Sequence, residues 1–309
     1  MSPLPAPRAA RDRLGFATLG CPGAPPAEVA ALARRHGCPY VELRSAEGEI
    51  LHTGLPAARV ARVRAELESA GLAVLALNTY VRLCAPSAGP DDDQRDALLA
   101  HVDLAAASGA RAVRAFMNDQ SSMNDQSSTN DPSSMHDPGE RGGGAPTEGE
   151  RRALDRLAHV APHAAAASVT IAVETHDSHS RADRTARFLT LLDREAPGHG
   201  CGVVWDTAHT WTHGETPAES LALLRPWLAY AQIKDVRAPA DPVPVPLGTG
   251  GYPVDALAAA LRADGYAGPL SLEWERMWHP ELPTLDEALT HVRTWAAPLL
   301  TDPPEESPA

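Results

Sequence analysis

The chain has 309 residues, and its 40 acidic residues outnumber its 27 lysines and arginines, which gives a formal net charge of −13. Because nucleic-acid binding needs a basic surface, this charge argues against a nucleic-acid partner. Hydrophobic residues make up 43% and charged residues 22%, ordinary values for a globular protein that exclude disorder throughout. No apolar stretch approaches the roughly 18 residues of a membrane span. The amino terminus also lacks the apolar core of a signal peptide, so we expect a cytoplasmic protein without a membrane partner.

Short runs of β-branched and aliphatic residues alternate with longer stretches of helical periodicity, a pattern typical of β-strand/α-helix units and a parallel sheet. The expected strands are 15–18, 40–43, 73–77, 112–116, 170–173, 202–205, 229–233 and 270–274. The expected helices are 27–36, 57–70, 93–107, 148–166, 182–194, 217–225, 254–264 and 284–296. Gly37, Gly71, Gly109 and Gly265 mark helix ends, and residues 284 and 287 have the spacing of a capping box. Eight strands, each followed by a helix, predict an α/β protein: a (β/α)8 or TIM barrel formed by a single domain.

One segment interrupts this pattern after the fourth strand. Residues 118–135 contain the near-copies NDQSSM, NDQSST and NDPSSM, and a glycine-rich stretch follows them. Units this short cannot stack a hydrophobic face, so we expect residues 118–147 to form a disordered, low-complexity insertion, with a mobile cover as the alternative. We expect the barrel to span residues 14–298, between disordered segments at 1–13 and 299–309.

In a TIM barrel the reactive groups stand at the carboxyl ends of the strands. Glu174 follows the fifth expected strand, Asp206 follows the sixth, Gln232 lies in the seventh and Glu273 lies near the end of the eighth. Carboxylates gathered at one end of a barrel repel each other unless a cation neutralises them. The pattern therefore predicts one divalent cation bound by Glu174, Asp206, Gln232 and Glu273. This oxygen-rich set favours Mn²⁺ or Mg²⁺, with Co²⁺ or Zn²⁺ as alternatives in vitro. Otherwise each carboxylate would cap a helix or form a salt bridge at a strand end.

Nearby polar residues are candidates for substrate binding. His209 is placed to hydrogen-bond a substrate hydroxyl, or else it is a solvated loop histidine, and the same two interpretations apply to His176 and His179. Lys234 alternates onto the strand face of Gln232, so it can bind a substrate oxygen or form a core ion pair with an acid.

Other residues are weaker candidates for a place in the substrate pocket. Glu42 and Arg114 can line the pocket from the opposite side or belong to a structural charge network, and His52 lies in the loop after the second strand. Residues 248–251 are glycine-rich and form either a turn or a backbone cradle for phosphate. Three apolar residues near the last strand can wall the substrate or pack in the core: Trp274, Met277 and Trp278.

The strings AVETH, WDTAH, AQIKD and LSLEWE, in this order and separation, resemble the motif set of the xylose-isomerase-like TIM-barrel superfamily of sugar phosphate isomerases and epimerases. The resemblance covers roughly residues 14–298. It implies that Glu174, Asp206, Gln232 and Glu273 bind one divalent ion. Gln232 stands where many members have His, as in hydroxypyruvate-isomerase-like members, which weakens any particular substrate assignment. Barrels of this family often pair, so a homo-oligomer is also within the expectation.

The activity implied by the resemblance is isomerisation or epimerisation of a small sugar or sugar derivative. A cation chelated by adjacent carbonyl and hydroxyl oxygens acidifies the C–H between them and stabilises an enediolate. Glu174 and Glu273 would act as base and acid. The alternatives are a dehydratase of the inosose or dehydroshikimate type, a type IV apurinic endonuclease-like protein, and a non-catalytic barrel that binds a sugar or a protein.

Overall fold

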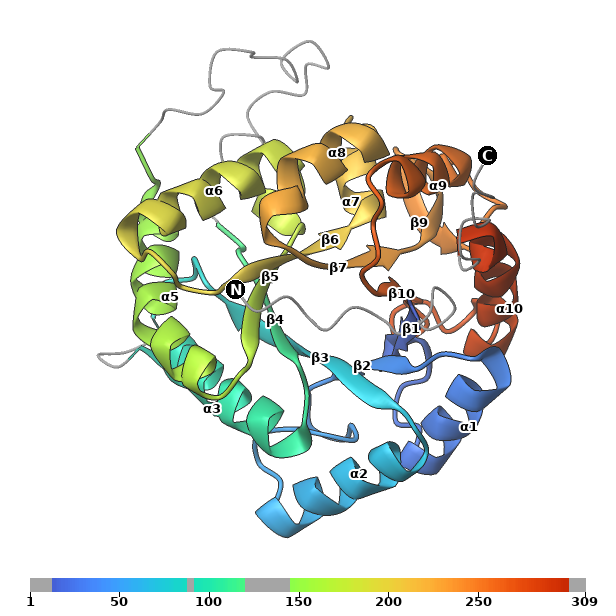
Figure 1. The fold of residues 1–309 in the computed structure, drawn as a ribbon, viewed down its shortest axis with the longest axis horizontal. Helices are drawn as coiled ribbons and strands as arrows, with labels where there is room; N and C mark the ends of the chain where they lie inside the picture. The colour runs from blue at the N-terminus through green and yellow to red at the C-terminus, as the bar shows by residue number, and fades with distance from the viewer. Residues whose placement is uncertain (1–12, 88–91, 120–144, 300–309) are drawn as a thin grey trace, which may run out of the picture.

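The computed structural model describes residues 13–87, 92–119 and 145–299. Within these residues, eight parallel strands close into a barrel in the order β1-β10-β7-β6-β5-β4-β3-β2, and helices surround it (Figure 1). The barrel strands are β1 (Leu14–Ala17), β2 (Tyr40–Arg44), β3 (Ala73–Arg82), β4 (Ala112–Phe116), β5 (Thr170–Glu174), β6 (Gly202–Asp206), β7 (Leu228–Ile233) and β10 (Leu270–Leu272). The TIM barrel expected from the sequence is confirmed.

The helices are α1 (Pro26–His36), α2 (Ala57–Ser69), α3 (Asp93–Ser108), α5 (Glu148–Ala166), α6 (Ala182–Glu195), α7 (Thr207–Thr212), α8 (Pro217–Leu224), α9 (Val254–Ala263) and α10 (Leu285–Ala296). The expected bounds agree with the structure to within two residues, except that β3 continues to Arg82. This extension pairs with the end of β4, where Arg82 lies opposite Phe116. Besides short 3-10 helices, the structure adds the short helix α7 and an antiparallel hairpin of β8 (Asp235–Ala238) and β9 (Asp241–Val245), which were not expected.

The helix ends follow local signals in the sequence. Gly37 ends α1 in the left-handed region with a φ of 66°, where a residue with a Cβ would be strained. Thr284 forms the expected capping box before α10: its hydroxyl accepts a hydrogen bond from the Glu287 amide, and the Glu287 carboxylate accepts one from the Thr284 amide. Thr147 and Glu150 form the same arrangement before α5. These signals set where the loops at the strand ends begin.

Side chains pack on both faces of the barrel strands. The larger hydrophobic core lies between strands and helices. A smaller cluster fills the interior of the barrel: Tyr40, Leu75, Ala76, Ala112, Ala172, Val204 and Tyr230. Side chains alternate along a strand, so residues two places further on share this inward face, and several of them are polar. These polar residues are Glu42, Asn78, Arg114, Glu174, Asp206 and Gln232. An apolar layer therefore supports a polar layer at the carboxyl ends of the strands.

Most of the expected insertion, residues 120–144, lies outside the described residues, as do residues 1–12 and 300–309. The residues that flank 120–144 contact each other, because the Thr147 hydroxyl donates a hydrogen bond to the Asp119 carboxylate at 2.6 Å. The described residues on either side of 120–144 therefore lie next to each other, between β4 and α5.

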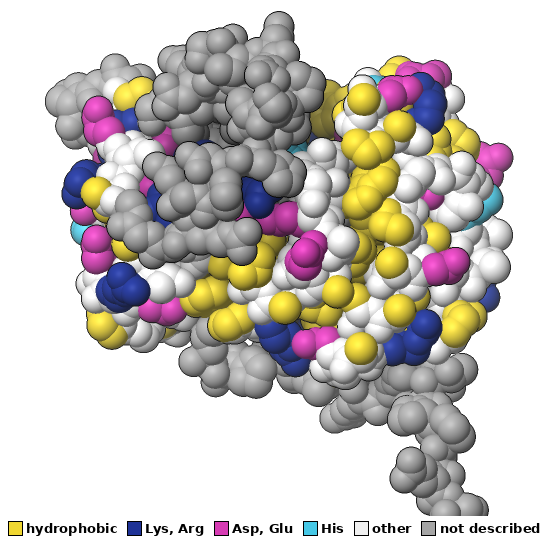
Figure 2. Space-filling view, turned by 90° about the horizontal axis from the view of Figure 1, so that it is seen from above, with side chains coloured by type: hydrophobic (Ala, Val, Ile, Leu, Met, Phe, Trp, Pro, Cys, Tyr) yellow, Lys and Arg dark blue, Asp and Glu magenta, His cyan; other side chains and the backbone are white. Residues whose placement is uncertain are grey.

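Figure 2 views the side of the molecule that carries α6, α8 and α9. Acidic, basic and apolar side chains of the described residues are interspersed on this face. Within the described parts of the chain, no helix combines the length and the apolar character needed to cross a membrane.

Candidate active site

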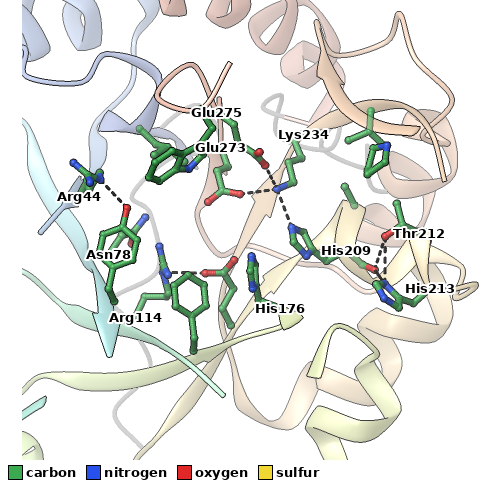
Figure 3. A pocket seen from close by; sticks show the side chains of 18 residues that line it. Arg44, Asn78, Arg114, His176, His209, Thr212, His213, Lys234, Glu273 and Glu275 are labelled. Atoms are coloured by element: carbon green, nitrogen blue, oxygen red, sulfur yellow. Dashed lines mark hydrogen bonds and ion pairs between the residues drawn. The ribbon is translucent and has the colours of Figure 1, made fainter. Parts of the chain in front are cut away.

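A pocket of about 350 Å³ opens at the carboxyl ends of the barrel strands (Figure 3). Small-molecule sites start at roughly 300 Å³, so the pocket can hold a compact ligand. Half of its lining residues carry charged or imidazole side chains: Arg44, Arg114, Glu174, His176, His209, His213, Lys234, Glu273 and Glu275. Tyr80, Phe116 and Trp278 add aromatic surface, and Trp278 is 54% exposed. This mixture of polar and aromatic groups suits a small hydroxylated compound.

The densest group of charges lies at the ends of β6, β7 and β10. The ammonium nitrogen of Lys234 is 2.9 Å from Asp206 Oδ2, 2.8 Å from Glu273 Oε2 and 2.5 Å from Glu275 Oε1. His209 Nε2 lies 3.0 Å from the same nitrogen (Figure 3). Because an ammonium has only donors, His209 accepts this hydrogen bond. We call the three carboxylates of Asp206, Glu273 and Glu275 the acidic cradle.

Local contacts orient the acidic cradle. Asp206 caps α7, because its Oδ1 accepts hydrogen bonds from the amides of Ala208 at 2.9 Å and His209 at 3.1 Å. Its other oxygen, Oδ2, is then directed toward Lys234. Helix capping at the end of β6 therefore fixes the orientation of the buried Asp206 carboxylate, with one oxygen facing Lys234.

Burial and the neighbouring charges shift the pKa values of the groups in the acidic cradle in opposite directions. Burial lowers the pKa of Lys234, but Asp206, Glu273 and Glu275 outweigh it and raise the pKa well above the usual value for lysine. Burial raises the pKa of Glu273, but the charge and hydrogen bond of Lys234 lower it to about 2. Burial raises the pKa of Asp206 well above its usual value despite the Lys234 charge. At neutral pH, Lys234 is charged and Glu273 is ionised.

The opposite wall of the pocket is formed by β4 and β5. Arg114 Nε lies 2.9 Å from Glu174 Oε2. Burial raises the pKa of Glu174, while the charge of Arg114 opposes this increase. Beside it, His176 Nδ1 lies 2.9 Å from Asp177 Oδ1. Burial lowers the pKa of His176, but the hydrogen bond with Asp177 and the charge of Glu174 raise it on balance. A carboxylate and an imidazole with raised pKa values are suited to proton transfer.

Glu42 orients Gln232 from across the barrel. Gln232 Nε2 donates a hydrogen bond to Glu42 Oε2 at 2.9 Å, and the Tyr230 hydroxyl donates to the same oxygen at 2.7 Å. Burial raises the pKa of Glu42 to about 7, although hydrogen bonds from Ser271 and Tyr230 lower it. Gln232 Oε1 is buried without a hydrogen-bond partner. This oxygen is therefore free to bind a cation.

The chemistry of these donors fits one divalent cation. Asp206, His209 and Glu273 each offer a ligand atom, and the three atoms lie within 4.8 Å of one another. Within the described residues, this is the one group of His, Cys, Asp and Glu side chains gathered in this way. Gln232 lies opposite Asp206 in the β6–β7 register. The Gln232 Oε1 atom, which has no hydrogen-bond partner, is therefore on the strand next to Asp206. Glu174, the remaining predicted ligand, is not in this group and forms an ion pair with Arg114.

Some candidates from the sequence lie away from the pocket. His179 is fully buried, with Nε2 3.3 Å from a carboxylate oxygen of Glu150, so it is a core residue. His52 Nδ1 accepts a hydrogen bond from the backbone of its own loop. Trp274 is 1% exposed and packs in the core. Glu42 is completely buried and is not among the lining residues, and its contacts are those of the buried network that was the other interpretation of this residue.

Residues 248–251 form a turn held by Asp235. Asp235 Oδ2 accepts hydrogen bonds from the amides of Gly248 and Gly250, both at 2.9 Å, and Oδ1 accepts one from the Tyr252 amide at 3.0 Å. Amides that already bind a carboxylate are not available to a phosphate. The turn is confirmed, and the interpretation as a phosphate cradle is wrong.

The structure adds residues to which sequence reasoning gave no role. Glu275 reaches Lys234, and its spacing of two from Glu273 on an extended segment was a usable signal. Val236 and Pro242 line the pocket from the β8–β9 hairpin, whose short, proline-containing strands gave no clear pattern. Arg44, which donates a hydrogen bond to the Tyr80 hydroxyl at 2.7 Å, also lines the pocket.

Comparisons with known proteins agree with this architecture. Among solved structures, the chain is similar to an L-ribulose 3-epimerase, with 18% identity, a TM-score of 0.67 and 94% of each chain covered. It is similar to the probable 3-DHS dehydratase AsbF from Bacillus anthracis, with 16% identity, a TM-score of 0.64, and 91% of this chain and 98% of that chain covered. It is also similar to the IOLI protein with a bound zinc atom, with 17% identity, a TM-score of 0.69, and 93% and 98% covered. At these identities the likeness shows the fold.

A search of curated proteins gives no significant match. A family model described as "Xylose isomerase-like TIM barrel" matches residues 30–295, which is most of the chain. The chain therefore belongs to the xylose isomerase-like TIM barrel family.

Proposed function

We propose that the protein is a divalent-metal-dependent isomerase or epimerase acting on a sugar or sugar derivative. One observation carries this proposal: the buried carboxylates of Glu174 and Glu273 line the same pocket, and Glu273 belongs to a group of candidate cation ligands with Asp206 and His209. Membership of the family and the similarity to the structure of an L-ribulose 3-epimerase support it.

The cation-binding residues in this proposal are Asp206, Gln232 and Glu273, with Glu174 completing the set and His209 as an alternative ligand or a substrate contact. Mn²⁺ or Mg²⁺ suits these mainly oxygen donors, and Co²⁺ or Zn²⁺ can replace them in vitro. When bound, the ion supplies Lewis acidity that polarises a substrate carbonyl and stabilises developing negative charge.

The protein groups then move the proton. Glu174 has a raised pKa and acts as the base or acid on one wall, and Glu273 has the corresponding role on the other. Arg114 holds the Glu174 carboxylate in place through its 2.9 Å ion pair. His209, His176 and Lys234 lie where hydroxyl oxygens of a small sugar can reach them.

A dehydratase is the second candidate, because His176 is suited to protonate a leaving hydroxyl. Its pKa is raised on balance by Asp177 and Glu174, against burial, so it is more readily protonated than an ordinary histidine. Loss of the same α-proton followed by departure of a β-hydroxyl would release water instead of an isomer. The similarity to the structure of a probable 3-DHS dehydratase is consistent with this alternative.

An exchange experiment separates the two reactions. Metal-stripped protein, with and without Mn²⁺, is incubated in deuterated water with ketoses, inososes and dehydroshikimate, and products are followed by NMR. Metal-dependent deuterium incorporation next to a carbonyl, without loss of water, is the expected result. Loss of water would assign the protein to the dehydratases. A lack of any exchange across the panel, with Mn²⁺ present, would count against both.

A further inference from the structure

Lys234 is the only lysine among the 309 residues, and the other 26 of the 27 basic residues are arginines. The chain uses arginine even for ordinary surface ion pairs, such as Arg64 with Glu68 and Arg237 with Asp241. A lysine in the centre of the pocket is therefore an exception to the chain's own usage. Lysine differs from arginine in having a compact point charge on a flexible stem, which can pivot between partners.

The surroundings of the Lys234 nitrogen have the character of a cation site. The side chain is 3% exposed, and four acceptor atoms lie 2.5 to 3.0 Å from the nitrogen: Asp206 Oδ2, Glu273 Oε2, Glu275 Oε1 and His209 Nε2. An ammonium has three N–H donors, so it cannot give each of the four acceptors a hydrogen bond of its own. The nitrogen is therefore surrounded by one more acceptor than it has N–H donors, as expected for a site that attracts positive charge.

The same groups that surround the ammonium are the candidate metal ligands. Asp206, His209 and Glu273 form the group whose ligand atoms lie within 4.8 Å of one another, and all three contact Lys234. A divalent cation bound by these atoms would lie next to the ammonium in a buried site, where like charges repel strongly. The two cations therefore exclude each other.

Glu275 offers the ammonium another place. It contacts Lys234, is 23% exposed and is not a member of the candidate ligand group. Figure 3 shows Glu273 and Glu275 both directed toward the lysine nitrogen. A pivot of the lysine stem would let the ammonium keep its bond to Glu275 while Asp206 and Glu273 turn to a metal ion.

We propose that the Lys234 ammonium and a divalent cation are alternative occupants of the acidic cradle, with Glu275 holding the ammonium when the metal ion enters. The metal part rests on the proposed function. In the metal-free protein, the ammonium neutralises carboxylates that would otherwise be buried and unpaired. In the metal-bound protein, it stays at the edge of the pocket, within reach of a substrate oxygen.

Mn²⁺ affinity at constant pH tests the competition directly. Lys234→Met is expected to bind Mn²⁺ more tightly than the wild type, on the order of tenfold or more, because no ammonium has to leave. Glu275→Gln is expected to bind it about fivefold or more weakly. In the Lys234→Met background, Glu275→Gln should have a much smaller effect. Arg64→Gln removes an exposed cation that pairs with Glu68 away from the pocket, and it serves as the control, with little change in Mn²⁺ affinity expected.

Amine modification provides a test on the unaltered protein, which matters if Lys234→Met does not fold. Since the chain has one lysine, peptide mass spectrometry reads reductive methylation at this site without interference from other side chains. The methylation rate is expected to rise severalfold when saturating Mn²⁺ releases the ammonium toward Glu275. A rate unchanged by Mn²⁺ that binds the protein would overturn the proposal.

The binding results also separate this inference from the proposed function. Equal Mn²⁺ affinity of the wild type and Lys234→Met overturns the competition and leaves a metal-dependent reaction intact. Binding by Lys234→Met with none by the wild type supports the competition and contradicts metal dependence of the natural protein. No binding by either protein overturns both.

Discussion

The acidic cradle and the surroundings of Glu150 are both built on buried carboxylates, but their partners differ. Glu150 is completely buried at the start of α5. Its oxygens accept hydrogen bonds from Arg187 at 2.6 Å and from the Thr147 amide at 2.9 Å, and His179 Nε2 lies 3.3 Å away. Burial raises the pKa of Glu150, but hydrogen bonds from His179 and Thr147 lower it to about 2.

In the acidic cradle, backbone amides hold one oxygen of Asp206, but the carboxylate oxygens that converge on Lys234 have no comparable set of donors. Its carboxylates share one lysine ammonium, two of them, Glu273 and Glu275, line the pocket, and the neighbouring Gln232 oxygen has no hydrogen-bond partner. Burial of an acid is therefore a poor guide to function in this molecule. A single shared ammonium, a buried amide oxygen without a partner and an adjoining pocket distinguish the site from a structural ion-pair cluster.

The largest expected effect is on catalysis. Glu174→Gln removes a proton-transfer group, and the metal-dependent exchange rate should fall by about 10³-fold or more. Because Gln keeps the shape of the side chain, the fold should persist, as measured by circular dichroism. Glu68→Gln, at an exposed carboxylate that pairs with Arg64, is the matched control and should keep full activity. Exchange by Glu174→Gln at the wild-type rate would contradict the role of this residue.

Glu150→Gln should affect stability instead of catalysis. It leaves Arg187 and the α5 capping box without their carboxylate, and the free energy of unfolding should fall by about 3 kcal/mol. Urea denaturation at neutral pH measures this loss, while the exchange rate per folded molecule should stay unchanged. A large loss of activity in folded protein would mean that the surroundings of Glu150 also serve the site.

The pH dependence of stability tests the structural role of Glu150. The pKa of Glu150 is about 2 in the folded protein and 4.5 as the unperturbed reference. A lowered carboxylate pKa stabilises the fold above the unfolded value, and the contribution disappears as pH falls through the folded value. The stability difference between wild type and Glu150→Gln should thus be full above about pH 4.5 and decline toward pH 2. A difference that stays constant over this range would contradict the ion pair.

A smaller effect is expected at the turn that follows β9. Asp235→Ala removes the acceptor for the amides of Gly248, Gly250 and Tyr252, and should cost about 2 kcal/mol of stability. Although Asp235 follows Lys234 directly, its oxygens bind the turn, so Mn²⁺ affinity measured by calorimetry should change less than about twofold. A large loss of affinity would show that the turn supports the acidic cradle.

The smallest effect concerns the exposed side of the pocket. Trp278→Ala removes an aromatic surface that is 54% exposed, so KM should rise by a few-fold with kcat nearly unchanged. Steady-state kinetics on the substrate identified by the exchange experiment measures both parameters. A fall in kcat alone would instead place Trp278 in the chemical step.

The fold was predictable because its signals are local. Hydrophobic periodicity located the strands and helices, and left-handed glycines such as Gly37 and capping pairs such as Thr284 with Glu287 fixed the helix ends. The rule that barrel strands end in reactive groups then selected the acids, and the structure brings Asp206 and Glu273 together. The pairing of Gln232 with Glu42 joins residues 190 positions apart, and no local pattern indicates it.

The position of the Lys234 ammonium could not be deduced either. The sequence placed Lys234 and Gln232 on one strand face, which left a substrate contact and an ion pair equally open. Lys234 reaches Asp206 and Glu273 because β7 lies between β6 and β10 in the barrel, and these two carboxylates stand at the ends of those neighbouring strands. Tertiary distances of this kind decide between a metal ligand and an ion-pair partner.

The most direct test of the account is the anomalous scattering of Mn²⁺ in crystals of the protein soaked with that ion. One strong peak is expected at the acidic cradle, in contact with Asp206 and Glu273. Crystals that show Mn²⁺ elsewhere, or no Mn²⁺ at all with Lys234 still bound to both carboxylates, would contradict it.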